Sequence, residues 1–409
     1  MKHRNKPGWE GALLCLGLML QNPPAVAGDF SYTVLTDVLQ VYDSNIFLAS
    51  DKAADETKLS DFITTISPAM ELAYQTERSR TAVTIRQDIS RYAEYDELDN
   101  VGQSYKGRFG YAINELSSID LSAGYRLDHS ADSELETSGL LLDTTERKRR
   151  NLGGEIQYAL SEKSGASLSY GFARDDYSND DPDSEFNTVS LTLTREVDWL
   201  PEAYVYGSGG VMFYQTDYSR QNSTSAVLGG GFRLSEEISL NIDAGVRKSQ
   251  EKYDEWGVQW LRVPPYYRLV TIERSEEEWG QIAHFQIAYQ GEATTVNLDF
   301  SYDMQPASGR GTLTERTQIG LDVVRRLNEE CRVRGFSSYF LNYREGLDQR
   351  YNVDETTVNL GIDLTYDFNR YVSLSGQYLH TLSQDDEDGT EADRNRFWVR
   401  LALKYPVVE

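Results

Sequence analysis

The chain has very little of the residues that usually cross-link or interrupt an exported fold. Only two of its 409 residues are cysteines, Cys15 and Cys331, and only ten are prolines. Because Cys15 lies in the predicted leader described below, the mature chain keeps a single cysteine and forms no internal disulfide. We therefore expect the fold to be stabilised by a large hydrogen-bonded sheet.

Long apolar runs are also missing after the first 27 residues. Residues 1–27 combine a basic start, an apolar stretch (Ala12–Leu20) and a small-residue cleavage site, Ala25-Val26-Ala27, which predicts a secretory signal peptide. Residues 28–409 contain no stretch near the roughly 18 apolar residues of a transmembrane helix. A helical membrane protein is therefore excluded, and the net charge of −25 argues against nucleic acid as a partner.

What the chain does contain is alternation with a period of two. In Thr295–Met304 every even position is apolar or aromatic and every odd position is polar, and Ile238–Arg247 repeats the pattern. This period predicts strands with one wet face.

The links between these segments alternate between short and long. Asn114–Ser117 is a short example, Ser130–Thr145 is a long one, and Lys252–Glu278 is the longest. Antiparallel strands that cross an outer membrane give this alternation, with tight turns on the periplasmic side. We expect residues 28–409 to form one all-β transmembrane barrel of about 18 strands, or alternatively 16, with both termini periplasmic.

Tyrosines support a membrane barrel over the alternative of a soluble all-β protein. Seven tyrosines have the apolar parity near the predicted periplasmic strand ends, where an aromatic girdle is expected. They are Tyr32, Tyr74, Tyr111, Tyr158, Tyr289, Tyr366 and Tyr405.

A barrel of this size encloses a water channel unless loops or a plug fill it. Strand parity predicts a lumen that carries charges of both signs, which either tune selectivity or satisfy one another. Phe336, Phe340 and Trp398 share this parity and are expected to stack on a solute or to pack an inserted loop. The candidate lumen-lining residues are Arg332, Arg334, Arg344, Arg396, Arg400, Asp120, Asp243, Asp299, Asp363 and Trp398.

The stretch Lys252–Glu278 is the longest candidate for a loop that folds into the lumen. Its aromatic rings lie among arginines, a combination that can stack on and hydrogen-bond a sugar; alternatively, the rings pack the loop onto the barrel mouth. The candidate saccharide contacts are Trp256, Trp260, Arg262, Tyr266 and Tyr267.

The sequence offers few candidate motifs for catalysis or for cofactor binding, and each of them fails. His380 and Ser383 fall on opposite faces of their strand, so they cannot form a nucleophile and base pair. The acidic stretches Asp175–Glu185 and Asp385–Asp393 are interpreted as solvated charge, because the second fails the EF-hand pattern around Gly389. We expect no catalytic residues, no metal site and no cofactor.

One short stretch is more specific. Tyr42–Phe47 (YDSNIF) resembles the Y-D-x-N-I-F signature of the β-barrel porin 2 family, and Ile66–Tyr74 with Glu77–Ser79 is similar to its second strand and first turn. Members of that family include outer-membrane barrels found with exopolysaccharide and exosortase-type gene clusters. Physically, Asp43 and Asn45 are expected to hydrogen-bond their own backbone as the strand leaves the membrane, and Ile46 and Phe47 to tuck against the mouth.

Three functions are compatible with these features. The resemblance implies a passive conduit for exopolysaccharide, with a polysaccharide and periplasmic export components as partners. The alternatives are a diffusion porin for small solutes and a structural or adhesion barrel with a closed lumen. Outer-membrane lipid is an expected partner in each case, and the oligomeric state stays open.

Overall fold

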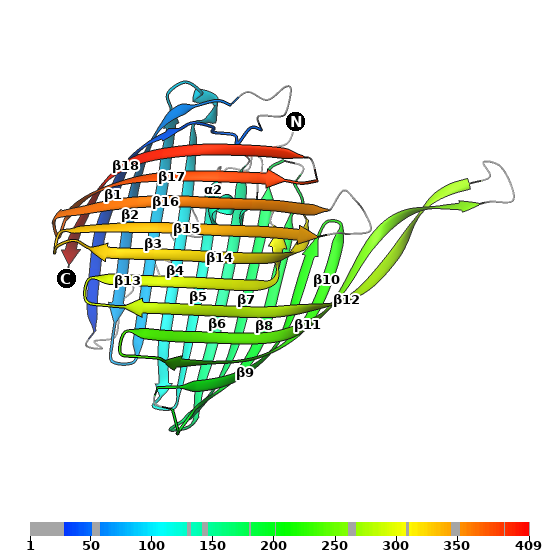
Figure 1. Ribbon diagram of the computed structural model, residues 1–409, viewed down its shortest axis with the longest axis horizontal. Helices are drawn as coiled ribbons and strands as arrows, with labels where there is room; N and C mark the ends of the chain where they lie inside the picture. The colour runs from blue at the N-terminus through cyan, green and yellow to red at the C-terminus, as the bar shows by residue number, and fades with distance from the viewer. Residues whose placement is uncertain are drawn as a thin grey trace, which may run out of the picture.

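Eighteen antiparallel strands form one closed sheet in the computed structural model of the chain (Figure 1). β1 pairs with β2 on one edge and with β18 on the other, which closes the barrel. This arrangement confirms the predicted barrel of 18 strands rather than 16. The strands are β1 (Asp29–Asp43), β2 (Asp61–Gln75), β3 (Ser79–Tyr92), β4 (Asn100–Asn114), β5 (Ser117–Asp128), β6 (Arg147–Ser161), β7 (Ser164–Tyr177), β8 (Ser184–Glu196), β9 (Tyr204–Thr216), β10 (Ser219–Arg233), β11 (Ile238–Trp260), β12 (Tyr267–Gln290), β13 (Thr294–Ala307), β14 (Thr312–Arg326), β15 (Cys331–Arg344), β16 (Val353–Asn369), β17 (Val372–Asp385) and β18 (Thr390–Val408).

In the described parts of the links, two short helical segments occur, a 3₁₀ turn at Asp96–Leu98 and helix α2 at Asp132–Thr137. No helix among the described residues is long and apolar enough to cross a bilayer. The structure describes residues 28–50, 58–128, 132–140, 146–179, 181–200, 202–260, 267–307, 311–344, 352–387 and 389–408.

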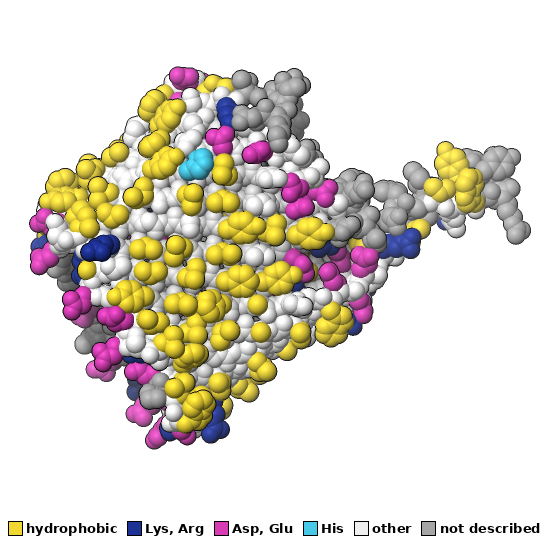
Figure 2. Space-filling view, viewed as in Figure 1, with side chains coloured by type: hydrophobic (Ala, Val, Ile, Leu, Met, Phe, Trp, Pro, Cys, Tyr) yellow, Lys and Arg dark blue, Asp and Glu magenta, His cyan; other side chains and the backbone are white. Residues whose placement is uncertain are grey.

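The outer face of the barrel is apolar because the strand register brings residues of one parity side by side. Ile156, Leu168 and Leu191 align across β6, β7 and β8, and each is about half exposed (46%, 47% and 50%). Hydrophobic side chains cover much of the wall in the same way in Figure 2. Their neighbours of the other parity, such as Glu155 and Ser169, face the lumen. A barrel with its apolar face outward fits a lipid environment.

The two ends of the barrel differ in their links. At one end the strands are joined by tight turns, such as residues 115–116 and 162–163. The pairing of Tyr32 with Val408 brings the two described chain ends together at this same end, as predicted. The predicted alternation of short and long links is nevertheless wrong at one point, because β9 and β10 are joined at the opposite end by residues 217–218 alone.

The prediction of a long loop at Lys252–Glu278 is wrong. β11 continues to Trp260 and β12 begins at Tyr267, so most of this stretch is a two-stranded hairpin that projects from the barrel (Figure 1). Above the lipid, outward positions no longer need apolar side chains, so the amphipathic pattern stops while the strand pairing continues. Lys248 and Glu277, for example, form an ion pair of 2.8 Å across the two strands.

We predict that Leu168→Arg destabilises the barrel, because it places a cation on the lipid face. The expected loss is about 2–4 kcal/mol if the site lies near the bilayer midplane. Ser169→Arg is the matched control, since its side chain points into the lumen and should change stability much less. Denaturant unfolding in lipid vesicles measures both variants, and equal losses would contradict this assignment of faces.

Candidate functional site

The first strand ends in a buried turn at the barrel mouth, opposite the tight-turn end. The backbone N–H of Asn45 donates to the Asp43 carboxylate (2.9 Å), as predicted for a strand that leaves the membrane. The Asn45 side chain is fully buried and donates to the carbonyl oxygens of Ala49 (3.0 Å) and Asp393 (3.1 Å). Phe47, by contrast, is 46% exposed, so the expectation that it tucks against the mouth is wrong. Leu48 takes the buried position instead.

The β5–β6 link enters the barrel as a short segment, residues 132–140, which we call the lumen segment; α2 forms most of it. Leu135 packs against Leu48 and Ala392, and Leu140 packs against Ala307 and Val353. Both leucines are essentially inaccessible to solvent, at 1% and 0% exposure.

Two lumen-facing side chains on the far wall hold the same segment. The Asn342 amide on β15 donates to the Ser138 carbonyl (2.8 Å), and the Thr357 hydroxyl on β16 donates to the Gly139 carbonyl (2.7 Å). Gly139 has a φ of +72°, and a Cβ at this position would collide with the Phe340 side chain. Phe340 thus packs an inserted loop, which is one of the two roles expected for a lumen aromatic.

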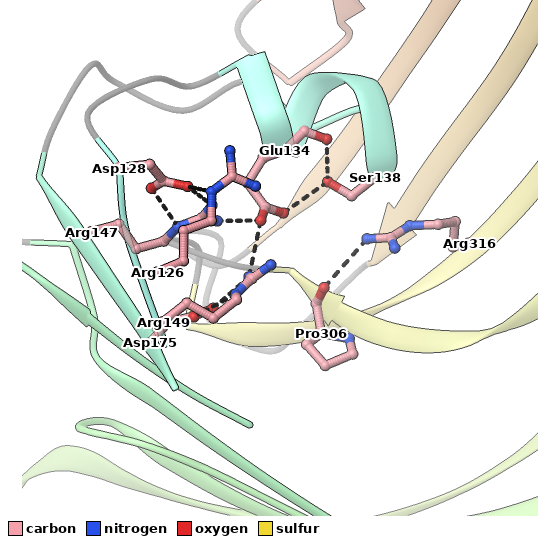
Figure 3. Close-up of polar contacts among 9 residues, drawn as sticks. All are labelled: Arg126, Asp128, Glu134, Ser138, Arg147, Arg149, Asp175, Pro306 and Arg316. Atoms are coloured by element: carbon pink, nitrogen blue, oxygen red, sulfur yellow. Dashed lines mark hydrogen bonds and ion pairs between the residues drawn. The ribbon is translucent and has the colours of Figure 1, made fainter. Parts of the chain in front are cut away.

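A network of buried ion pairs holds the lumen segment to the neighbouring strands β5, β6 and β7 (Figure 3). Glu134 of α2 pairs with Arg147 and with Arg149, the latter at 2.9 Å. Arg147 also pairs with Asp128 at 2.7 Å, and Arg149 binds Asp175 through two bonds of 2.7 Å. Because these side chains are largely removed from water, loss of one partner would leave a buried charge without its ion pair.

Arg316 on β14 reaches the same region from another part of the wall (Figure 3). Its guanidinium donates to the Asn342 side chain (2.7 Å) and to the Pro306 carbonyl (3.3 Å). Among the described residues, no carboxylate forms an ion pair with it. Arg316 therefore places a positive charge beside the lumen segment without a direct ion pair in the described part of the chain.

A second piece of chain fills the mouth from the side of β13 and β14. We call residues 303–307 and 311–315 the mouth hairpin. Met304 and Leu313 have the outward parity of their strands, yet they are 4% and 0% exposed and pack against Tyr214, which faces the lumen from β9. The Thr216 hydroxyl on β9 also donates to the Gly311 carbonyl (3.3 Å). The mouth hairpin has therefore bent into the barrel.

The mouth hairpin and the lumen segment touch through Ala307 and Leu140. Together they form a continuous layer from the inner wall at β9 to the inner wall at β15 and β16, which we call the partition. The constriction predicted for Lys252–Glu278 is thus wrong in position, because other links supply it.

The strand register places all ten candidate lumen residues on the inner parity. Arg334 pairs with Asp322, and Asp243 contacts His284 at 2.7 Å. Trp398 donates to Gln377, and the Arg400 guanidinium lies 5.3 Å from the Trp398 ring centre. The ten residues are spread around the wall and do not converge on one site: Arg332, Arg334, Arg344, Arg396, Arg400, Asp120, Asp243, Asp299, Asp363 and Trp398.

The candidate saccharide contacts divide between described and undescribed residues. Trp260 and Tyr267 face each other across the tip of the β11–β12 hairpin, with ring centres 6.2 Å apart and exposures of 78% and 54%. They do not pack the mouth. Arg262 and Tyr266 lie outside the described residues, as does the side chain of Trp256.

Several residues of the partition, and of the ion pairs that hold it to the wall, were missed from sequence. Glu134, Arg147 and Arg149 lie in or beside a predicted outer loop, and Asp175 was interpreted as solvated charge. The available signal was the apolar run at residues 140–142, because three leucines in an aqueous loop need a buried place to pack.

Comparisons with known proteins support the fold only. No protein-family model and no curated protein matches the chain. The open form of the ferric-catecholate import receptor Fiu from E. coli K12 is similar at a TM-score of 0.50 and 7% identity, covering 94% of this chain and 82% of that chain. OccK2 (OpdF) of Pseudomonas aeruginosa, solved in complex with glucuronate, has a TM-score of 0.47 and 9% identity, covering 92% and 98%. Pseudomonas aeruginosa OpdL has a TM-score of 0.44 and 12% identity, covering 92% and 99%.

The closed 18-strand sheet, the apolar outer face and the polar lumen define an outer-membrane β-barrel. The protein resides in the outer membrane of a Gram-negative cell and is in contact with its lipid.

We predict that Gly139→Ala releases the lumen segment, because the new methyl group meets Phe340 and the backbone is strained. Gly389→Ala is the matched control: its φ is +65°, so it carries the same backbone strain of about 1–2 kcal/mol, but its surroundings are open. We expect a larger fall in thermal stability for Gly139→Ala, together with new protease cleavage at residues 132–140. Equal behaviour of the two variants would contradict the contact.

Proposed function

We propose that this chain is an outer-membrane channel for small polar solutes. The observation that carries the proposal is the partition: a barrel of 18 strands has a wide polar lumen, and the lumen segment and the mouth hairpin narrow it at one end. The partition is built from chain segments fixed by buried bonds to the wall. Such a layer suits a filter that admits small molecules and holds back polymers.

The partition is also charged, which supports a selective rather than a purely structural role. Among the side chains drawn in Figure 3, which lie in or beside the partition, arginines outnumber carboxylates, and Arg316 forms no ion pair within the described residues. Paired charges at a narrow point order the water and any ions that pass.

Export of an exopolysaccharide is the second candidate function. It is supported by the resemblance of Tyr42–Phe47 to the β-barrel porin 2 family and by the exposed ring pair of Trp260 and Tyr267, which can stack on sugars. This function requires the partition to move aside. Deletion of the gene should then abolish surface polysaccharide, and unchanged secretion would remove this candidate.

We predict that the purified barrel conducts ions in a planar bilayer in steady single-channel steps. Gly139→Ala should raise the conductance of each step, because it displaces the lumen segment, whereas Gly389→Ala should leave it near that of the wild type. A folded wild-type barrel without conductance would overturn the proposed function.

A further inference from the structure

The wall of the barrel is incomplete on one side. β12 pairs with β13 only between Ala283 and Gln290, although β12 itself begins at Tyr267. β13 likewise continues to Ala307 and stays paired with β14 to that point, but its pairing with β12 ends at Tyr302. Two strand edges that should meet are therefore separated above this level.

The separation follows from the bend of the mouth hairpin. If β13 ran straight, Met304 would lie on the outer wall; instead, its sulfur accepts a hydrogen bond from the Gln221 amide on β10 (3.1 Å). Gln221 is on the lumen-facing side of β10, beside Glu251 of β11. The hairpin that closes the mouth thus leaves the seam beside it open.

A cavity of about 450 Å³ occupies this seam, and we call it the side cleft. Lumen-facing Ser249, Glu276 and Glu278 line it together with outward-facing Glu277 and Tyr343. Because residues of both parities contribute, the side cleft lies at the interrupted edge of the wall, where its inner and outer faces meet.

The side cleft opens at the outer rim of the apolar band. Going up the outward face of β12, lipid-facing Phe285 gives way to Trp279, which is 69% exposed, and then to Glu277. Tryptophan at this position is typical of the interface between lipid and water. The opening is therefore at the level of the lipid head groups and not in hydrocarbon, where unpaired strand edges would be costly.

The lining of the side cleft accepts hydrogen bonds and carries negative charge. It holds five glutamates and one arginine, Arg344, which is paired with Glu251. Among the described residues, Glu276 and Glu278 have no cationic partner. The oxygen of the Gln221 side chain, which is 3% exposed, has no hydrogen-bond partner in the described part of the chain. A buried acceptor beside carboxylates is satisfied by water or by a ligand that donates hydrogen bonds, so the side cleft favours a solute with donor groups and positive charge.

We propose that the side cleft is the outer entrance of the channel and that it takes small solutes bearing an ammonium or guanidinium group. This proposal rests on the proposed channel function. The solute enters between β12 and β13, below the top of the partition, and its cation replaces water at Glu276, Glu278 and the Gln221 oxygen. The volume of the cavity lies in the range of pockets that hold small-molecule ligands and is too small for a folded polymer.

The charge part of the proposal is tested by the reversal potential of the reconstituted full-length protein in a potassium chloride gradient. The wild type should prefer cations, and spermidine added on the loop side should reduce the current. In Glu276→Gln/Glu278→Gln both effects should weaken. In the control Glu237→Gln/Glu292→Gln, which alters two exposed carboxylates in the tight turns at the other end, both should persist. Equal selectivity in the two double variants would overturn the proposal.

The route is tested by locking the partition. Leu140→Cys/Ala307→Cys in a Cys331→Ser background joins the lumen segment to the mouth hairpin when oxidised. If solutes use the side cleft, conductance and cation preference survive oxidation. If oxidation abolishes the current and a reductant restores it, solutes pass through the moving partition instead. That result would contradict the side entrance but would keep the proposed channel function.

Discussion

The structure depends on the requirement that every backbone N–H and C=O group in hydrocarbon be paired within the protein. A sheet satisfies this only when it has no open edge, and the pairing of β1 with β18 removes the edge. Closure with 18 strands has a consequence, because a barrel so wide cannot fill its interior with its own wall side chains. Chain segments that leave the wall fill part of that interior. The gap in pairing between β12 and β13 falls where the outward face has already become polar.

The interior is filled at the mouth by chain that leaves the wall. The lumen segment and the mouth hairpin bury leucines, a methionine and an alanine against the wall and, at Leu140 and Ala307, against each other, so small apolar clusters form inside an otherwise polar lumen. The buried pairs of Glu134 with Arg147 and Arg149 then fix the position of the lumen segment. If the segment moved, buried charges would lose their ion-pair partners. The inward bend of the mouth hairpin also separates β13 from β12, and this separation forms the side cleft.

Much of the fold could be predicted from sequence, because lipid imposes a pattern. Alternation in Thr295–Met304 and in similar segments shows which side chains face the lipid. It also predicted the number of strands and that both termini lie at the same end of the barrel. Above the lipid that pattern breaks down over most of the β11–β12 hairpin and returns only at its tip, where Val258 and Trp260 alternate with Gln259. The hairpin was therefore mistaken for a loop. The partition could not be predicted in the same way. Its contacts join Glu134 to Arg147 locally but Ser138 to Asn342 across 204 positions, and no local pattern encodes such a pair.

The central claim is that the lumen segment is held inside the barrel between two walls. Hydrogen exchange of the amides in residues 134–140, followed by mass spectrometry on the barrel in lipid vesicles, tests it most directly. The amides of Ser138 and Gly139 bond to the Glu134 carbonyl and lie in a buried layer. We predict that they exchange as slowly as amides of neighbouring strands. Exchange as fast as that of the exposed turn at residues 198–199 would contradict the account.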